Sequence, residues 1–242
     1  MSEPVYKRVL LKISGEALAG GTGFGLDAGT LSYLAKEVAA LHSLGVQVAI
    51  VVGGGNFLRG ETLSSTASVE RSVADQMGMM GTVINGLAIQ SAVENAGVAC
   101  RVQSAISINA VCEPFIKRRA IRHLEKGRVV VFVAGTGNPY FTTDSAAALR
   151  ALEIDANCLL KATKVDGVYD KDPNKHNDAV KYEKVSFGEA LSKRLRIMDQ
   201  AAFALCQENG LPVIVMDMND HGVMTRAVMG EPVGTLVYAG EA

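Results

Sequence analysis

Lys12 is the side chain whose type and position best suit chemistry on phosphate groups. Lys12 is a cation inside the apolar run RVLLKI at residues 8–13, directly before the turn Ser14-Gly15. Asp144 stands at the start of a predicted helix, after a loop rich in glycine and threonine. Phosphoryl transfer needs positioned cations and dipoles more than covalent help from the protein. Lys12 is therefore a candidate for catalysis, and its ordinary alternative is a lysine that extends to solvent from a strand end. The ordinary reading of Asp144 is a helix cap.

Glycine-rich segments directly follow two of the predicted strands. Gly53-Gly54-Gly55 follows the apolar run 46–52, and the segment 134–139 (AGTGNP) follows the run 129–133. Successive glycines let the backbone approach a ligand closely, and a helix N-terminus attracts anions. Ligands of open α/β sheets bind where the carboxyl ends of the strands meet. The sequence therefore predicts a phosphate-binding edge, although each segment also has the plainer reading of a tight turn.

The common nucleotide-binding fingerprints are absent from the sequence. It contains no G-x-x-x-x-G-K-[ST], no G-x-G-x-x-G after a strand, and neither the H-R-D nor the D-F-G element. A P-loop protein, a Rossmann dinucleotide site and a protein kinase are thereby excluded.

Apolar runs of strand type alternate with stretches of helical period along the whole chain. This alternation is typical of the α/β class, and it predicts a three-layer αβα sandwich with a mostly parallel central sheet. The predicted strands are 8–13, 46–52, 98–102, 129–133, 156–161, 213–216 and 235–238, the last at a sheet edge. The predicted helices are one that Asp27 caps and Gly45 ends, then 69–95, 113–125, 146–152, 187–195, 198–209 and 221–229.

Composition limits the class of protein. The 242 residues are 48% hydrophobic and 20% charged, which suits one domain over 1–242. We expect two lobes of about 1–152 and 153–242, and the polar loop after Lys161 is the segment best suited to a lobe boundary. A net charge of -1 without a long basic run argues against nucleic acid as a partner. We expect no membrane span, four buried thiols and a cytoplasmic location. The four histidines lack the spacing of metal ligands, so no protein metal site is predicted.

Four motifs together carry a family resemblance. KISGEAL at 12–18, VVGGGNFLRG at 51–60, GTGNPYFTTDSAA at 135–147 and LKATKVDGVYDKDP at 160–173 resemble the amino acid kinase family in order and spacing. GGGNFLRG followed by ADQMGM, and GTGNPYFTTD, are similar to the branch of that family that phosphorylates UMP. The resemblance covers about Tyr6 to Val237. It implies the amino acid kinase fold and direct in-line phosphoryl transfer from ATP to UMP, giving UDP, in pyrimidine nucleotide biosynthesis.

The resemblance also implies roles for individual residues, with Lys12 and Asp144 as the catalytic pair and Asp144 orienting lysines or the acceptor region. Plainer alternatives remain open for Asp75 on a solvated helix face, for Asp172 in a turn and for Tyr169 in packing. The implied ATP-binding residues are Lys12, Ile13, Ser14, Gly15, Gly55, Arg59, Thr163, Tyr169 and Asp172. The implied UMP-binding residues are Gly54, Asp75, Thr136, Gly137, Asn138, Pro139, Tyr140, Phe141, Thr142 and Thr143.

Cofactor, regulation and assembly follow from the same resemblance. It implies Mg²⁺ bridging the ATP phosphates, GTP as activator and UTP as inhibitor in an allosteric enzyme, and a homohexamer. The loop Gly20, Gly21, Thr22, Gly23, Phe24, Gly25 resembles the segment linked to the GTP response, and Arg101 and Arg128 are expected near a regulatory surface. Lys117 departs from the aromatic residue that some relatives carry. The apolar stripe Met79, Met80, Val83, Ile84 and Leu87 suits subunit contacts or the interior of one subunit.

Two competing functions remain at this point. The first is another small-molecule kinase of the same fold that phosphorylates an amino acid, carbamate or isopentenyl phosphate. The second is a nucleotide-binding storage or sensor protein without catalysis. The presence of both Lys12 and Asp144 counts against the second.

Overall fold

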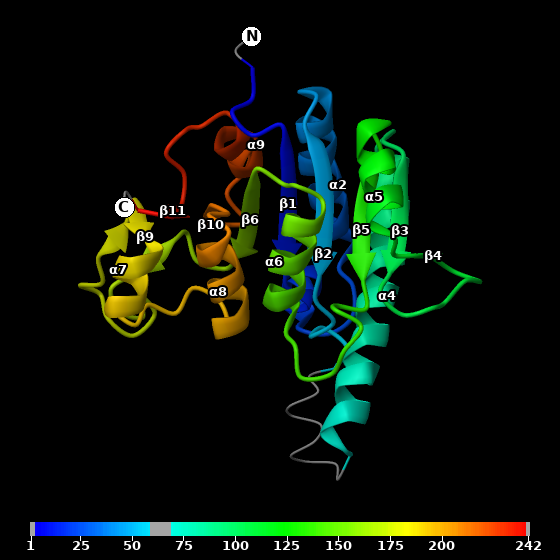
Figure 1. Ribbon diagram of the computed structural model, residues 1–242, viewed down its shortest axis with the longest axis horizontal. Coiled ribbons are helices and arrows are strands. Elements are labelled where there is room, and N and C mark those ends of the chain that lie inside the picture. Colours follow the sequence, from blue (N-terminus) through cyan, green and yellow to red (C-terminus); the bar gives the residue numbers. More distant parts are fainter. Residues whose placement is uncertain (1–2, 59–68, 241–242) are drawn as a thin grey trace.

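The computed structural model describes residues 3–58 and 69–240, and a twisted sheet forms its centre (Figure 1). In this part of the chain the sheet has nine strands in the order β4-β3-β5-β2-β1-β6-β10-β11-β9. Every pairing is parallel except the one between β10 and β11. The strands are β1 (Arg8–Ile13), β2 (Gln47–Val52), β3 (Cys100–Ser104), β4 (Glu113–Pro114), β5 (Val129–Val133), β6 (Cys158–Thr163), β9 (Lys184–Ser186), β10 (Val213–Asp217) and β11 (Thr235–Tyr238).

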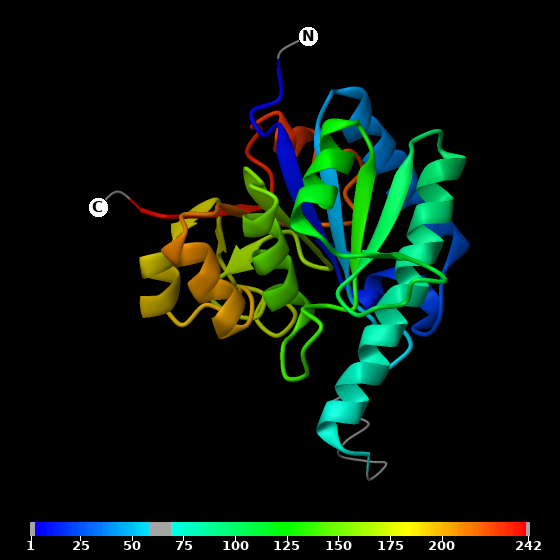
Figure 2. The ribbon, with the colours of Figure 1, turned by 45° about the vertical axis from the view of Figure 1, so that its right-hand side comes forward.

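Helices cover both faces of the sheet, so the predicted three-layer αβα sandwich is confirmed (Figure 2). One face carries α2 (Ala28–Ser43), α4 (Arg71–Asn95) and α9 (Val223–Val228). The other carries α5 (Lys117–Glu125), α6 (Thr143–Glu153), α7 (Phe187–Ser192) and α8 (Gln200–Glu208). The short helix α1 (Gly15–Leu18), a 3₁₀ turn at Gly20–Thr22 and the hairpin of β7 (Val168–Tyr169) and β8 (Lys181–Tyr182) complete the description.

Burial on both faces explains why the central strands read as unbroken apolar runs. Val9 and Leu11 of β1 pack under α2 and α9, whereas Leu10 between them packs in the core beneath α6. All five residues of Val129–Val133 are buried in the same way. The four cysteines are buried and unpaired, as the sequence predicts. Of the described helices, none combines the length and apolarity needed to cross a membrane.

Several predicted elements differ from the structure. The helix predicted from residue 113 begins only at Lys117, because Glu113-Pro114 pairs with β3 as strand β4. The strand at 235–238 is not at an edge, since β9 lies beside it. That edge strand and the β7–β8 hairpin arise from residues 168–186, of which the first few belong to the predicted polar loop and the rest carry no predicted element. Strands of two or three residues carry too little periodicity to be recognised.

The helix after the Gly135 loop begins earlier than predicted. It starts at Thr143 rather than near Ala146, because the Thr142 hydroxyl accepts the backbone N–H groups of Asp144 and Ser145. Thr142 is therefore the cap. Asp144 lies in the first turn, so its carboxylate is not used for capping and can serve another purpose.

Candidate active site

The candidate site lies at the carboxyl edge of the sheet, where β1, β2, β5 and β6 end side by side. Lys12 of β1 pairs in register with Val51 of β2 on one side and with Lys161 of β6 on the other. Two lysines on adjacent strands therefore occupy the same level of the sheet. The N-terminal part of α4 extends beyond this edge in the ribbon (Figure 2).

Asp144 holds both lysines. Its Oδ1 lies 2.8 Å from Lys12 Nζ, and its Oδ2 accepts a hydrogen bond of 2.6 Å from Lys161 Nζ. Lys161 Nζ also donates to the carbonyl oxygen of Ile197 at 2.5 Å. The three charged side chains are only 11–16% exposed. We call Lys12, Asp144 and Lys161 the charge cluster.

Lys161 is a site residue that the sequence analysis missed. It sits inside CLLKAT, where the flanking residues are apolar and buried. The available signal is the same one that identifies Lys12, a cation within an apolar strand that ends at the ligand-binding edge. Only the strand register shows that Lys161 and Lys12 are neighbours.

Burial and charge act in opposite directions on these groups. Burial alone raises the pKa of Asp144, but the two ammonium groups outweigh it, so that pKa lies below its ordinary range. Burial lowers the pKa of Lys161, an effect that Asp144 opposes and the charge of Lys12 reinforces. With the carboxylate ionised, two cations face one anion. The cluster therefore carries surplus positive charge, which suits phosphate oxygens.

A hollow of about 470 Å³ opens beside Lys12. Its wall combines backbone turns from three strand ends with side chains from the start of α4. It is lined by Lys12, Ser14, Gly15, Glu16, Gly53, Gly54, Gly55, Leu58, Arg71, Asp75, Gly78, Met79, Thr82, Gly135, Thr136, Asn138, Phe141, Thr142 and Thr143. Of the residues predicted to bind ATP or UMP, this one hollow thus brings together eleven. We call it the first hollow.

The glycines of the first hollow allow close approach of backbone to backbone. A Cβ on Gly15 would lie 2.5 Å from the Gly55 nitrogen, and one on Gly54 would lie 2.4 Å from the Gly78 oxygen. Such contacts are too short for any side chain at these two positions. Gly15 thus lets the turn after β1 pack against the turn after β2, and Gly54 lets the latter turn pack against α4. The close approach of these glycines to a ligand stays a prediction.

Asp75 connects α4 to the loop after β5, so it is not simply on a solvated face. It pairs with Arg71 at 2.9 Å, and its Oδ2 accepts the backbone N–H of Tyr140 at 2.9 Å. Tyr140 has a φ of 71°, a left-handed conformation that is unusual for a large side chain. Asp75 therefore holds the loop at the wall of the first hollow.

A second hollow, of about 460 Å³, lies on the β6 side. Tyr169 and Asp172 line it, whereas Thr163 does not. The Thr163 hydroxyl donates to the oxygen of Val165, which is a lining residue. Asp172 also accepts the N–H of Asn174, so its reading as a turn residue stays open. The lining residues are Val165, Gly167, Val168, Tyr169, Asp170, Lys171, Asp172, Pro173, Asn174, Lys175, Arg194, Leu195 and Arg196. We call it the second hollow.

Several predicted site residues lie elsewhere. Ile13 is buried in the core, and Gly137, Pro139 and Tyr140 do not line the first hollow. Arg59 lies outside the residues that the structure describes.

The loop 20–25, expected to respond to GTP, is joined to the glycine turn after β2. The Gly25 N–H donates to the Asn56 oxygen, and the Asn56 side chain donates to the Gly25 oxygen at 2.7 Å. Asn56 in turn exchanges amide hydrogen bonds with Asn85 of α4. The loop therefore contacts the residue that follows Gly55.

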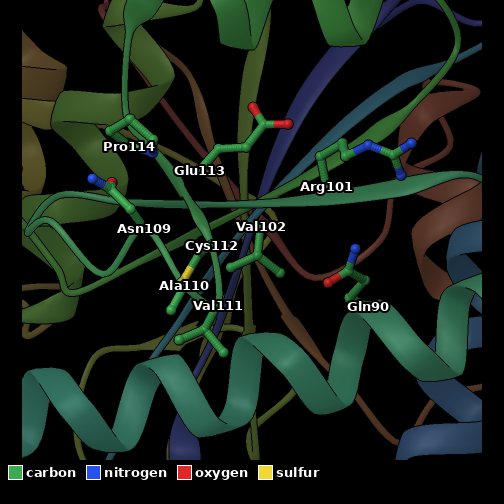
Figure 3. A pocket seen from close by; sticks show the side chains of 9 residues that line it. All are labelled: Gln90, Arg101, Val102, Asn109, Ala110, Val111, Cys112, Glu113 and Pro114. Atoms are coloured by element: carbon green, nitrogen blue, oxygen red, sulfur yellow. The ribbon is translucent and has the colours of Figure 1, made fainter.

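A third hollow, of about 480 Å³, lies apart from the charge cluster (Figure 3). Arg101 and Gln90 lie on one side of it, and Asn109 and Pro114 lie on the other. None of the residues predicted for catalysis, ATP or UMP lines it. We therefore place the chemistry at the charge cluster.

Comparison with known proteins agrees with this geometry. A sequence profile of the amino acid kinase family matches residues 7–217. The chain is 54% identical over 237 residues to the uridylate kinase of Dichelobacter nodosus, and 55% identical over 237 residues to that of Xanthomonas oryzae pv. oryzae, covering 98% of each chain in both cases. The crystal structure of UMP kinase from Bacillus anthracis superposes with a TM-score of 0.94 at 38% identity, covering 98% of this chain and 97% of that one. The UMP kinase structure from Ureaplasma parvum gives a TM-score of 0.90 at 36% identity, covering 98% and 100%.

Proposed function

Since the chain belongs to the amino acid kinase family, we propose that it is a kinase that transfers the γ-phosphoryl group of ATP to UMP and so forms UDP. The observation that carries the proposal is the charge cluster, in which Asp144 holds two lysines at the wall of the first hollow. Full-length identity of about 55% to uridylate kinases supports UMP as the acceptor. The competing acceptors of the same fold and a non-catalytic role are not favoured.

Direct in-line transfer fits the groups that are present. A UMP phosphate oxygen forms the new bond to the γ-phosphorus while the bond from that phosphorus to the β–γ bridging oxygen breaks, and ADP leaves with the electron pair. The attacking phosphate is already an anion at neutral pH, so no general base is needed. Lys12 and Lys161 stabilise the charge on the transferred group, and Asp144 fixes both ammonium groups in place.

The two hollows suggest how the nucleotides are divided. We propose that UMP occupies the first hollow, against Gly54, Asp75 and the loop 136–143, and that the ATP phosphates lie between Lys12 and the Gly15 turn. The adenosine end would occupy the second hollow, beside Tyr169 and Asp172. This division corresponds to a UMP lobe of about 1–152 and an ATP lobe of about 153–242.

Magnesium is proposed to enter with ATP as part of the substrate. The described residues gather no group of three or more histidine, cysteine, aspartate or glutamate side chains able to hold a metal ion. Mg²⁺ commonly keeps several waters and binds through substrate phosphates with few protein ligands. That mode suits a site whose carboxylate, Asp144, is already paired with two lysines.

A homohexamer is the proposed assembly, and the apolar stripe of α4 supports subunit contacts. Met79 and Val83 of that stripe are buried within the subunit, whereas Met80 and Ile84 are 39% and 49% exposed. Val73 and Met77 continue the exposed row at helical spacing. Light scattering that finds a stable, active monomer would contradict this assembly.

The loop 20–25 and the four cysteines bear on regulation and on cellular location. GTP is proposed as activator through the loop 20–25, which contacts Asn56 beside the glycine turn, and UTP as inhibitor. Four buried, unpaired cysteines suit a reducing compartment, and we propose a cytoplasmic role in pyrimidine nucleotide synthesis.

The acceptor specificity is the first test. The acceptors compared are UMP, CMP, dUMP and acetylglutamate, with MgATP as donor and release of ADP as the readout. We expect turnover with UMP and much weaker turnover with CMP. A site that hydrogen-bonds the uracil edge leaves polar groups unpaired with cytosine, which can give discrimination of roughly 10⁴–10⁵. Equal turnover of CMP and UMP would refute the UMP assignment, and no turnover with any acceptor would refute catalysis.

A further inference from the structure

Asp199 lies outside the charge cluster, in the segment between the Lys161 contact at Ile197 and the start of α8. It caps α8 by accepting the Ala202 N–H at 3.0 Å on Oδ1. The same carboxylate reaches the first turn of α6, where it accepts the hydroxyl of Ser145 at 2.9 Å and 3.0 Å and the hydroxyl of Thr142. One side chain therefore links α8 to the helix that carries Asp144.

The hydroxyl of Thr142 has no hydrogen-bonding capacity to spare. Its oxygen accepts the N–H groups of Asp144 at 3.1 Å and Ser145 at 3.3 Å, which occupy both lone pairs. Its single proton goes to Asp199 Oδ2. The Asp199 carboxylate thus orients the hydroxyl of Thr142, and that hydroxyl accepts the backbone N–H of Asp144.

The segment that holds Asp199 also contacts the second lysine of the charge cluster. Ile197, two residues earlier, accepts the hydrogen bond of Lys161 Nζ at 2.5 Å. Burial lowers the pKa of Lys161, and the negative charges of Asp144 and Asp199 oppose that shift. Residues 197–199 therefore contact Lys161 directly and Asp144 through Thr142.

We propose that Asp199 is a positioning residue for phosphoryl transfer. It holds the first turn of α6, which carries Asp144, in place beside Lys161. The inference rests on the proposed function, because it assigns a role at the same site. Three donors converge on two carboxylate oxygens, the Ala202 N–H on Oδ1, the Thr142 hydroxyl on Oδ2, and the Ser145 hydroxyl between them. An asparagine offers one acceptor oxygen, so it must give up either the α8 cap or the tie to Thr142.

Asp199→Asn tests this role. We expect kcat to fall by about 10–100-fold, the range seen when groups that orient reacting residues are removed. The KM values for UMP and ATP should stay within about threefold, because Asp199 does not itself line the hollow that we assign to UMP and reaches its wall only through Thr142.

Helix-cap loss elsewhere provides the matched control. Asp27 caps α2 by accepting the N–H of Thr30 at 2.7 Å and its hydroxyl at 2.8 Å, away from the charge cluster. Asp27→Ala should lower the melting temperature without the loss of kcat. If Asp199→Asn lowers kcat no more than Asp27→Ala does, the positioning role is refuted and Asp199 is only a cap.

A double-variant cycle isolates the tie between the two helices. Asp199→Ala and Thr142→Val each remove the contact between residues 142 and 199, so their effects on kcat should be strongly non-additive. Losses that multiply in the double variant overturn the inference. Should Asp199→Asn fail to fold, Ser145→Ala decides, since it removes one donor to Asp199 and should lower kcat severalfold; unchanged kcat overturns the inference.

All variants are compared with the acceptor that the wild type phosphorylates fastest. A wild type that prefers an acceptor other than UMP refutes the proposed function, while the comparison between the variants still decides the role of Asp199.

Discussion

Lys12→Ala is expected to lower kcat by on the order of 10²–10³ and to leave the Kd for UMP little changed. Lys12 lines the first hollow, and its Nζ is paired with Asp144 at 2.8 Å. The ammonium group is therefore held in position before the transferred group arrives. Interactions that are stronger in the transition state than in the ground state raise kcat. Loss of one preorganised donor of this kind costs about 2.7–4 kcal/mol in other enzymes. Steady-state kinetics with calorimetric titration of UMP separates the two effects.

The control for Lys12 is Lys7, a lysine just before the opposite end of the same strand that pairs with Glu3 in solvent. Lys7→Ala should leave kcat unchanged. Lys12→Arg should recover only part of the activity, because a planar guanidinium places its donors differently from a compact ammonium. Turnover of Lys12→Ala within a few-fold of wild type would show that Lys12 only extends from the strand end.

Asp144→Asn is expected to abolish most of the activity and to destabilise the fold at neutral pH. The Asp144 carboxylate lies between two ammonium groups, with Lys12 on Oδ1 and Lys161 on Oδ2. All three side chains are mostly buried. Without it, Lys12 and Lys161 repel one another, and the buried Lys161 loses the charge that favours its protonation. Removing one partner of a buried ion pair costs about 3–5 kcal/mol. Activity and the free energy of unfolding in urea are measured on the same preparation.

The pH dependence of that destabilisation gives a second readout for Asp144. Its pKa in the folded protein lies below its ordinary value, although burial alone would raise it, because Lys12 and Lys161 favour the ionised form. The stabilisation is therefore present above about pH 4 and is lost as the pH falls through the lower folded pKa. The stability difference between wild type and Asp144→Asn should shrink toward acid pH. A difference that grows on acidification would contradict the ion-pair account.

The sequence predicts the fold well where long elements repeat one period. The apolar strands 8–13 and 129–133 appear at the predicted residues, because strands buried on both faces are unbroken hydrophobic runs. The helix predicted at 69–95 begins at Arg71. Short elements are different, since β4 and the β7–β8 hairpin have two residues per strand and depend on partners far along the chain.

The candidate site is predictable in part for a similar reason. Lys12 can be chosen from the sequence because it departs from its local pattern at a strand end, whereas the role of Asp144 follows from the family resemblance. Lys161 departs in the same way, but its importance depends on the register of β1 against β6, which local sequence does not contain. The sequence places Asp199 inside the predicted helix 198–209 and gives no sign of a role, and only the packing of α8 against α6 brings it to Thr142 and Ser145.

The stereochemistry of transfer tests the central claim most directly. ATPγS made chiral at the γ-phosphorus with oxygen isotopes serves as donor, UMP serves as acceptor, and the configuration of the transferred thiophosphoryl group is determined in the product. One direct in-line displacement between two nucleotides at the charge cluster predicts inversion at phosphorus. Retention of configuration would require two successive displacements through a phosphorylated enzyme, and it would contradict direct transfer from ATP to UMP.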